Sequence, residues 1–231
     1  LHRSPAKDPS AALDALVAPL PTIERRADMA YSGRFGYLTS APKYLGAGLS
    51  VSVILHLPYS LFRGRTYSYP SRGADKSVVF EPLMGNNFEQ HGFFRVSSTI
   101  GFGRREDEIV TEVFDFASSL VNEENSIRNE FKHSETRRIE RIMQRVLHHS
   151  KMSYRLSYAD VLRFISFLSL GIDRGVIDIP AFNFETIVPG LTSAYIMYTD
   201  RRRYTVNECE KRRAELFADI IEKWTSPVAA G

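Results

Sequence analysis

The chain has 231 residues, 43% of them hydrophobic and 25% charged, which excludes wholesale disorder, a collagen-like repeat and a membrane bundle. Its 30 Lys and Arg residues against 27 Asp and Glu residues leave a net charge of +3, too small an excess to indicate nucleic-acid binding. The single cysteine, Cys209, excludes an intrachain disulfide and a cysteine-based zinc site. We therefore expect a cytoplasmic globular protein without a signal peptide, a membrane anchor or a metal site formed by its own side chains.

The N-terminal residues predict a tether followed by a larger domain. Residues 1–22 are punctuated by prolines, and within them Ala11–Val17 is compatible with at most a short helix. Residues 23–31 carry the pattern of one or two helical turns. We expect residues 1–22 to be a flexible tether, residues 23–149 a larger domain and residues 150–231 a helical region.

Short strands dominate the next part of the chain. The alternation of Leu49–Leu57 predicts the clearest strand, and residues 36–39, 78–84 and 92–100 predict three others. Residues 40–48 contain the breakers of a loop. Residues 59–77, rich in Ser, Tyr, Arg and Gly, predict an irregular excursion.

Helices dominate the remainder. Apolar residues at helical spacing between Ile109 and Leu147 predict a long helical run with a break near His133–Ser134. Capping patterns at Ser157 with Asp160 and at Thr205 with Glu208 predict two helix starts, and Pro189 is expected to start a helix that reaches about Tyr198. Strands first and helices last predict an α+β fold, an antiparallel sheet flanked by helices.

Residues Arg34–Pro58 (RFGYLTSAPKYLGAGLSVSVILHLP) carry a recognisable pattern. They resemble the GYLT-x-C-P-x-N-x-G-T-G-L-R-A-S-V-x-x-H-L-P signature of the ATP:guanido phosphotransferases, closest to the bacterial protein-arginine kinases. Phe93–Ile109, Leu168–Ile177 and Arg213–Leu216 resemble further family segments in the correct order. The resemblance covers about residues 23–224. It implies the later part of such an enzyme without its N-terminal helical domain, with residues 23–149 as a truncated guanido-kinase-like catalytic domain.

The resemblance also implies where the chemistry of the family falls. The reactive cysteine of the family falls on Ala41, the loop asparagine on Tyr44 and a phosphate-clamp arginine on Ser50. A second clamp arginine falls on Glu81 and the catalytic glutamate on Asn86. Arginine forks hold phosphates and a carboxylate positions the guanidinium group, so these positions are degenerate for phosphoryl transfer.

Nucleotide-binding candidates remain in the same region. They are Ser50, Val51, Ser52, Val53, Ile54 and His56, with Arg63, Arg65 and Arg72 as arginines that could replace the lost clamp. His56 could equally be a packing residue on a strand, and the arginines could be solvated.

The bacterial branch of the family also carries an R-D-x-x-R-A motif that binds phosphoarginine. It aligns with Cys209–Ala214, which makes Glu210 and Arg213 phosphoarginine-binding candidates. The alternative is a helix-surface pair three residues apart.

Two further groups of arginines stand out along the chain. They are Arg137, Arg138, Arg141 and Arg145, and Arg201, Arg202 and Arg203. Each group is compatible with a solvated surface or with a patch for phosphate or an acidic partner.

The residues therefore favour a pseudokinase that serves as a regulatory or binding module in protein quality control and needs no cofactor. Expected partners are a second copy, bound through an exposed sheet edge, or a cognate arginine kinase, its activator or the Clp protease machinery. The alternative is an active kinase that phosphorylates protein arginine with ATP and Mg²⁺, its N-terminal part being supplied elsewhere.

Overall fold

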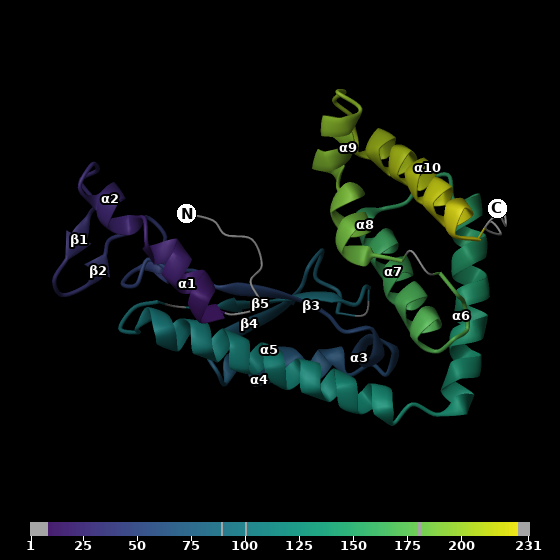
Figure 1. Cartoon of the computed structure of the whole chain (residues 1–231), viewed down its shortest axis with the longest axis horizontal. Helices are drawn as coiled ribbons and strands as arrows, with labels where there is room; N and C mark the ends of the chain where they lie inside the picture. The colour runs from purple at the N-terminus through teal and green to yellow at the C-terminus, as the bar shows by residue number, and fades with distance from the viewer. Residues whose placement is uncertain (1–8, 89, 100, 180–181, 226–231) are drawn as a thin grey trace. The chain divides into compact units, whose positions relative to one another are not determined.

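The structure is a computed structural model that describes residues 9–225 except 89, 100, 180 and 181. Contacts divide the chain into two compact units (Figure 1). Unit 1 comprises residues 1–55, 67–83 and 94–123, and unit 2 comprises residues 56–66, 84–93 and 124–231. The units interleave along the chain, and whether residues 23–149 and 150–231 form separate domains stays a prediction.

Unit 1 is built around a three-stranded sheet. Its strands are β3 (Ser52–His56), β5 (Phe93–Ser98) and β4 (Val78–Pro82), in the order β3-β5-β4. β4 and β5 are antiparallel, with Phe80 opposite Val96. Helix α4 (Tyr69–Ala74) packs on β4. The core of the unit contains large side chains that are almost fully buried: Tyr69, Phe80, Phe94, Val96, Val113, Phe116 and Leu120.

The smaller elements of unit 1 lie near its N-terminal end. They are α1 (Pro9–Val17), α2 (Leu20–Glu24), the two-stranded hairpin β1 (Tyr31–Ser32) and β2 (Gly36–Tyr37), and the short 3-10 helix η1 (Pro42–Tyr44). The described part of the expected tether is therefore mostly helical, although none of the residues in α1 and α2 is buried. The helical turns expected at residues 23–31 end at Glu24, because Tyr31 pairs with Tyr37 instead.

Residues 59–77 are not irregular as the composition predicted. They form α3 (Pro58–Phe62), η2 (Thr66–Ser68) and α4. Pro58 and Pro70 occupy the first turns of α3 and α4, where proline is tolerated. In unit 2 the buried Glu124 carboxylate accepts hydrogen bonds from the backbone N–H groups of Tyr59 (2.6 Å) and Ser60 (2.8 Å). This cap comes from a distant part of the sequence, so local composition could not reveal it.

The long helical run breaks where the sequence predicted. Helix α5 (Glu106–Asn129) ends before α6 (His133–Met152) begins. Residues 106–123 of α5 belong to unit 1, and its last turns belong to unit 2. The acidic first turn of α5 favours a helix N-terminus.

Unit 2 is a helical assembly. Helix α6 packs against α7 (Tyr158–Asp173) and α10 (Val206–Thr225). Both predicted capping boxes are confirmed: the Ser157 hydroxyl accepts from Asp160 N, and the Thr205 hydroxyl accepts from Glu208 N. The buried core includes Ile139, Leu162, Ile165, Leu168, Phe217 and Ile221.

The helix expected to start at Pro189 was placed wrongly. Pro189 lies near the end of α8 (Phe184–Gly190), and a separate α9 (Ser193–Thr199) follows. Asn183 caps α8 and Thr192 caps α9 through their side-chain oxygens. These two polar residues, not the proline, determine where the helices begin.

The antiparallel sheet with flanking helices confirms the predicted α+β class. Each predicted strand is shorter than its sequence pattern. Ile100 at the end of the last expected strand and residues 1–8 of the expected tether lie outside the described residues. In the part of the chain that the structure describes, no helix is both long and apolar enough to cross a membrane.

Candidate functional site

One face of the unit 1 sheet is buried and the other is open. Val78, Phe80 and Pro82 of β4 are buried, whereas Val79 and Glu81 between them are exposed or half-buried. Strand β5 alternates in the same way around Arg95, and antiparallel pairing places Arg95 opposite Glu81. Successive strand residues point to opposite faces. We call the outward set the open face: Ser52, Ile54, Val79, Glu81, Arg95 and Ser97.

Strand β3 brings candidate nucleotide-binding residues to this face. Ser98 N donates to Val51 O and Leu57 N donates to Gly92 O. Both bonds fit one antiparallel register, which places Ile54 opposite Arg95. The side chain of Ile54 is 61% exposed. The same alternation turns Val53 away from the open face and leaves Ser52 on it.

The charge of the open face is balanced within the sheet. Arg95 Nε and Nη2 lie 2.9 Å and 2.8 Å from Glu81 Oε1. Arg95 is the single Lys or Arg in β3, β4 and β5, whose residues are all described. An arginine engaged by a carboxylate has fewer donors left for a phosphate.

The loop before β3 brings two degenerate family positions together. A hydrogen bond with Lys43 is the main cause that lowers the pKa of Tyr44, and a hydrogen bond with Ser50 acts in the same direction. Lys43 Nζ also lies 4.6 Å from the Tyr44 ring centroid. Ala41 is engaged through its backbone, where its carbonyl accepts from the Thr39 hydroxyl at 2.8 Å. Asn86 is exposed in unit 2.

His56 lies in an aromatic cluster of unit 2. Its ring stacks on Phe93 with centroids 4.2 Å apart and an interplanar angle of 12°, and the Phe184 ring lies 5.1 Å away. Burial among these rings lowers the pKa of His56 to about 3. The contacts agree with the packing alternative for this histidine.

The hydrogen bonds around His56 define its tautomer. Ser166 Oγ donates to Leu162 O at 3.1 Å and accepts from Gly92 N at 3.3 Å. The hydroxyl proton of Ser166 is therefore already donated to Leu162. In the 3.0 Å contact between Ser166 Oγ and His56 Nε2, the imidazole must then be the donor. We assign a neutral imidazole protonated on Nε2, an assignment that follows from the network.

Arg63 and Arg72, two of the three arginines proposed to replace the clamp, have carboxylate partners. Arg63 in unit 2 binds both Glu135 oxygens at 3.0 Å. Arg72 in unit 1 lies 2.6 Å from Glu123. Arg65 is exposed, and its backbone N–H donates to Ser60 O. The contacts tie Arg63 and Arg72 to different units.

Arg213 is not part of a helix-surface pair, because its side chain is buried. Its Nε donates to Leu191 O at 2.8 Å, Nη1 to Leu156 O at 2.9 Å and Nη2 to Ser193 Oγ at 2.7 Å. Only 2% of Arg213 is exposed, and this burial lowers its pKa. The guanidinium group of Arg213, which belongs to α10, thus connects this helix with the residue before the α7 cap and with the junction between α8 and α9. The carbonyl of Glu210, the other candidate, accepts from Leu156 N.

The neighbouring arginine, which the sequence did not single out, faces a pocket of about 280 Å³ in unit 2. Arg212 lines this pocket and lies 2.9 Å from Asp200. The rest of the wall comes from α8, α9 and α10 and is mainly apolar, including Ile187, Ile196 and Leu216. A pocket this size suits one side chain better than a nucleotide.

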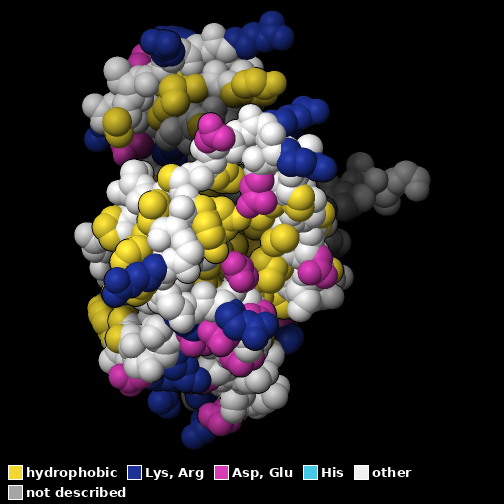
Figure 2. All heavy atoms as spheres, turned by 90° about the vertical axis from the view of Figure 1, so that its left-hand side faces the viewer, with side chains coloured by type: hydrophobic (Ala, Val, Ile, Leu, Met, Phe, Trp, Pro, Cys, Tyr) yellow, Lys and Arg dark blue, Asp and Glu magenta, His cyan; other side chains and the backbone are white. Residues whose placement is uncertain are grey.

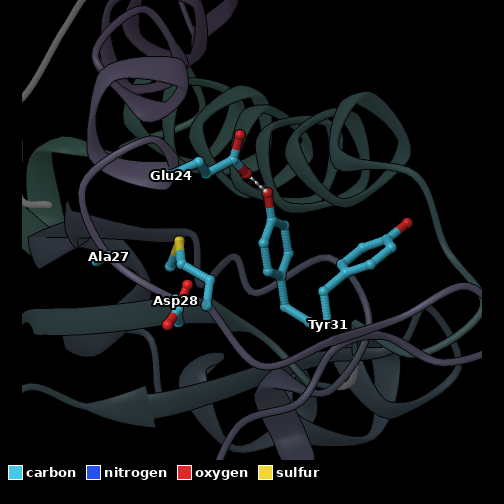
Figure 3. Close-up of a pocket in the computed structure, with 6 residues that line it drawn as sticks. Glu24, Ala27, Asp28 and Tyr31 are labelled. Carbon is cyan, nitrogen blue, oxygen red and sulfur yellow. Dashed lines mark hydrogen bonds between the residues drawn. The ribbon is translucent and has the colours of Figure 1, made fainter.

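A second pocket of about 430 Å³ lies in unit 1, between α2 and the β1–β2 hairpin (Figure 3). Glu24 and Asp28 line it with Tyr31 and Tyr37. The Tyr37 hydroxyl donates to Glu24, which raises the pKa of Tyr37. Figure 2 is seen from the left-hand side of Figure 1, where α2 and the hairpin are drawn, and it shows hydrophobic side chains gathered on that face. The sequence signal for this pocket is weak, because its residues come from a loop and two very short strands.

Comparison with known proteins identifies the family. Residues 4–127 match the ATP:guanido phosphotransferase, C-terminal catalytic domain. The chain therefore belongs to the ATP:guanido phosphotransferase family, as its motifs predicted.

The similar curated proteins are protein-arginine kinases. A protein-arginine kinase of Staphylococcus haemolyticus (strain JCSC1435) is 27% identical over 214 residues, covering 88% of this chain and 59% of that protein. The protein-arginine kinase of Staphylococcus epidermidis (strain ATCC 12228 / FDA PCI 1200) is 26% identical over 210 residues, covering 87% and 59%. That of Halothermothrix orenii (strain H 168) is 26% identical over 200 residues, covering 84% and 56%. The chain thus spans less than two thirds of the length of these relatives.

Proposed function

We propose that this chain is a protein-arginine kinase homologue that no longer transfers phosphate and acts as a binding module. The observation that carries the proposal is the charge of the open face. Phosphoryl transfer relies on positive charge around the phosphates, supplied by arginines and Mg²⁺. Here the single cationic side chain of the three strands, Arg95, is paired with Glu81.

The loop residues support the same proposal. Ser50 and Ala41 offer a hydroxyl and a methyl group where the family resemblance places an arginine and a cysteine. Neither can hold a phosphate bidentately or act as a thiolate. The residues present do not fit MgATP, so we derive no reaction step through it.

An active ATP-dependent arginine kinase is the alternative function. It requires Arg63, Arg65 and Arg72 to provide the missing charge. Arg63 and Arg72 are engaged by Glu135 and Glu123, and releasing them would leave those partly buried carboxylates unpaired. The contacts therefore favour the binding module.

The same proposal includes a cytoplasmic location. It also includes a partner, which is either a second copy of this chain or a component of protein quality control. Such partners are a cognate arginine kinase, its activator or the Clp protease machinery. The support is the family relationship and the short sheet, whose edge strands β3 and β4 can pair with another chain. A dimer seen by light scattering would favour the second copy.

Thermal stabilisation by nucleotide tests the proposal. A ligand present at about 100 times its Kd stabilises a protein by about 2.7 kcal/mol, which raises the Tm of a chain this size by roughly 5–10 °C. We expect MgADP and MgATP at millimolar concentration to leave Tm unchanged. A matched variant, Glu81→Gln, frees Arg95 without changing the backbone. A clear Tm rise in the parent chain would refute the proposal.

A further inference from the structure

Helix α6 presents a basic face to solvent in unit 2. Its buried positions are Ile139, Met143 and Val146, which are at most 5% exposed. They face α7 and α10, with which α6 is in contact. The opposite face carries exposed Arg137, Arg141 and Arg145 at four-residue spacing. We call these three residues the arginine stripe.

The arginine stripe has no ion-pair partner among the described residues. Arg145 Nε donates weakly to the Arg141 carbonyl at 3.4 Å, and no carboxylate in the described part of the chain accepts from any of the three side chains. Arg63, by contrast, is paired with two glutamates in the same unit. Like charges four residues apart destabilise a helix. The stripe is therefore a cost to the isolated chain that a negatively charged partner would remove.

We propose that the arginine stripe docks an acidic helical segment of a partner protein. Four residues of a helix rise about 6 Å, so the stripe extends about 12 Å from Arg137 to Arg145. Carboxylates repeating every four residues on a second helix have the same spacing. Each guanidinium fork can then bind one carboxylate, bidentately where the geometry allows.

The chemistry of α6 favours a protein over a nucleic acid. Its sequence, HSETRRIERIMQRVLHHSKM, contains no Phe, Tyr or Trp on which a base could stack. The inference concerns unit 2 alone and goes beyond the proposed function, because it does not depend on nucleotide binding at the open face.

Fluorescence anisotropy with a defined probe tests this inference. The probe is a labelled, alanine-based helical peptide of about 20 residues with Glu at every fourth position. We expect saturable binding at low salt that weakens when NaCl is raised. A matched peptide with Gln in place of Glu should not bind.

Two triple variants of the full chain separate the stripe from general basicity. Substituting Arg137, Arg141 and Arg145 by Gln should weaken peptide binding about tenfold, the sum of three exposed ion pairs. Substituting Arg201, Arg202 and Arg203 by Gln removes the same charge and should change binding less than about twofold. The stripe variant should also unfold at the parent Tm or about 1–3 °C above it, since the like-charge repulsion is gone.

Three outcomes would overturn the inference. They are equal weakening by both triple variants, parent-like binding by the stripe variant, and tenfold tighter binding of a single-stranded DNA of equal charge than of the acidic peptide. The last outcome would assign the surface to nucleic acid. None of these readouts measures binding of MgADP or MgATP, so the inference can fail without the proposed function failing.

Discussion

Replacing Arg213 by Lys separates a structural role from a ligand-binding one. The guanidinium donates to two backbone carbonyls and one hydroxyl, at 2.8, 2.9 and 2.7 Å. Lysine keeps the charge but has no planar fork, so it cannot reach three acceptors in these directions. The substitution leaves buried oxygens without their donors.

The magnitude follows from the bonds lost. A hydrogen bond to a charged group contributes about 1.5–3 kcal/mol, and two of the three bonds are lost in the lysine variant. Repacking and water entry offset part of that loss, so we expect about 3 kcal/mol of destabilisation. For a chain of this length the Tm should fall by roughly 6–12 °C.

Thermal unfolding followed by circular dichroism measures the effect, with Arg212→Lys as the matched control. Arg212 is more exposed and binds the carboxylates of Asp200 and Glu215, so its variant should unfold within about 3 °C of the parent. If Arg213→Lys is as stable as the parent, the reasoning fails. If it is also unable to bind phosphoarginine that the parent binds, Arg213 is a ligand-binding residue instead.

Further predictions concern the buried polar groups of unit 2. Glu124→Gln removes the charge that receives the Tyr59 and Ser60 N–H groups and should cost about 2–4 kcal/mol in urea unfolding; a loss below about 0.5 kcal/mol would contradict the capping role. His56 has a folded pKa of about 3, below its unfolded value, so its contribution to stability is present above about pH 6.5 and is lost as the pH falls toward 3. His56→Phe should therefore flatten the pH dependence of unfolding between pH 6.5 and 4, and an unchanged slope would refute the burial argument. Tyr59 donates a hydrogen bond to Asp173, and its pKa is raised to about 12, mainly by burial and secondly by this bond. In an absorbance titration, Tyr59→Phe should therefore remove one tyrosine that ionises at a higher pH than ordinary tyrosines. If the variant instead loses a tyrosine that ionises at the ordinary pH, the raised pKa of Tyr59 is contradicted.

Local signals in the sequence predicted the features that depend on near neighbours. The two capping boxes join residues three positions apart, and strand alternation reports which face of one strand is buried. For the caps and the strands, the deciding contacts lie within one turn or one strand. The break between α5 and α6 was predicted from length instead, because a single helix of more than about 40 residues is uncommon.

The features that the sequence could not predict depend on contacts between residues far apart in the chain. Helix α3 is capped from Glu124, 64 positions beyond Ser60, in a segment whose composition indicates a loop. Arg213 lies in a helix with alternating charges, and its burial depends on carbonyls 22 and 57 positions away. The Glu81–Arg95 pair required the register of β4 and β5, which no motif specifies.

The proposed binding module should not bind MgATP. The most direct test is calorimetric titration of the purified chain with MgADP and MgATP. We expect no measurable heat of binding at millimolar nucleotide. Binding in the micromolar range that is abolished by replacing Arg63, Arg65 and Arg72 would refute the proposed loss of the nucleotide site and show that these arginines form a working one.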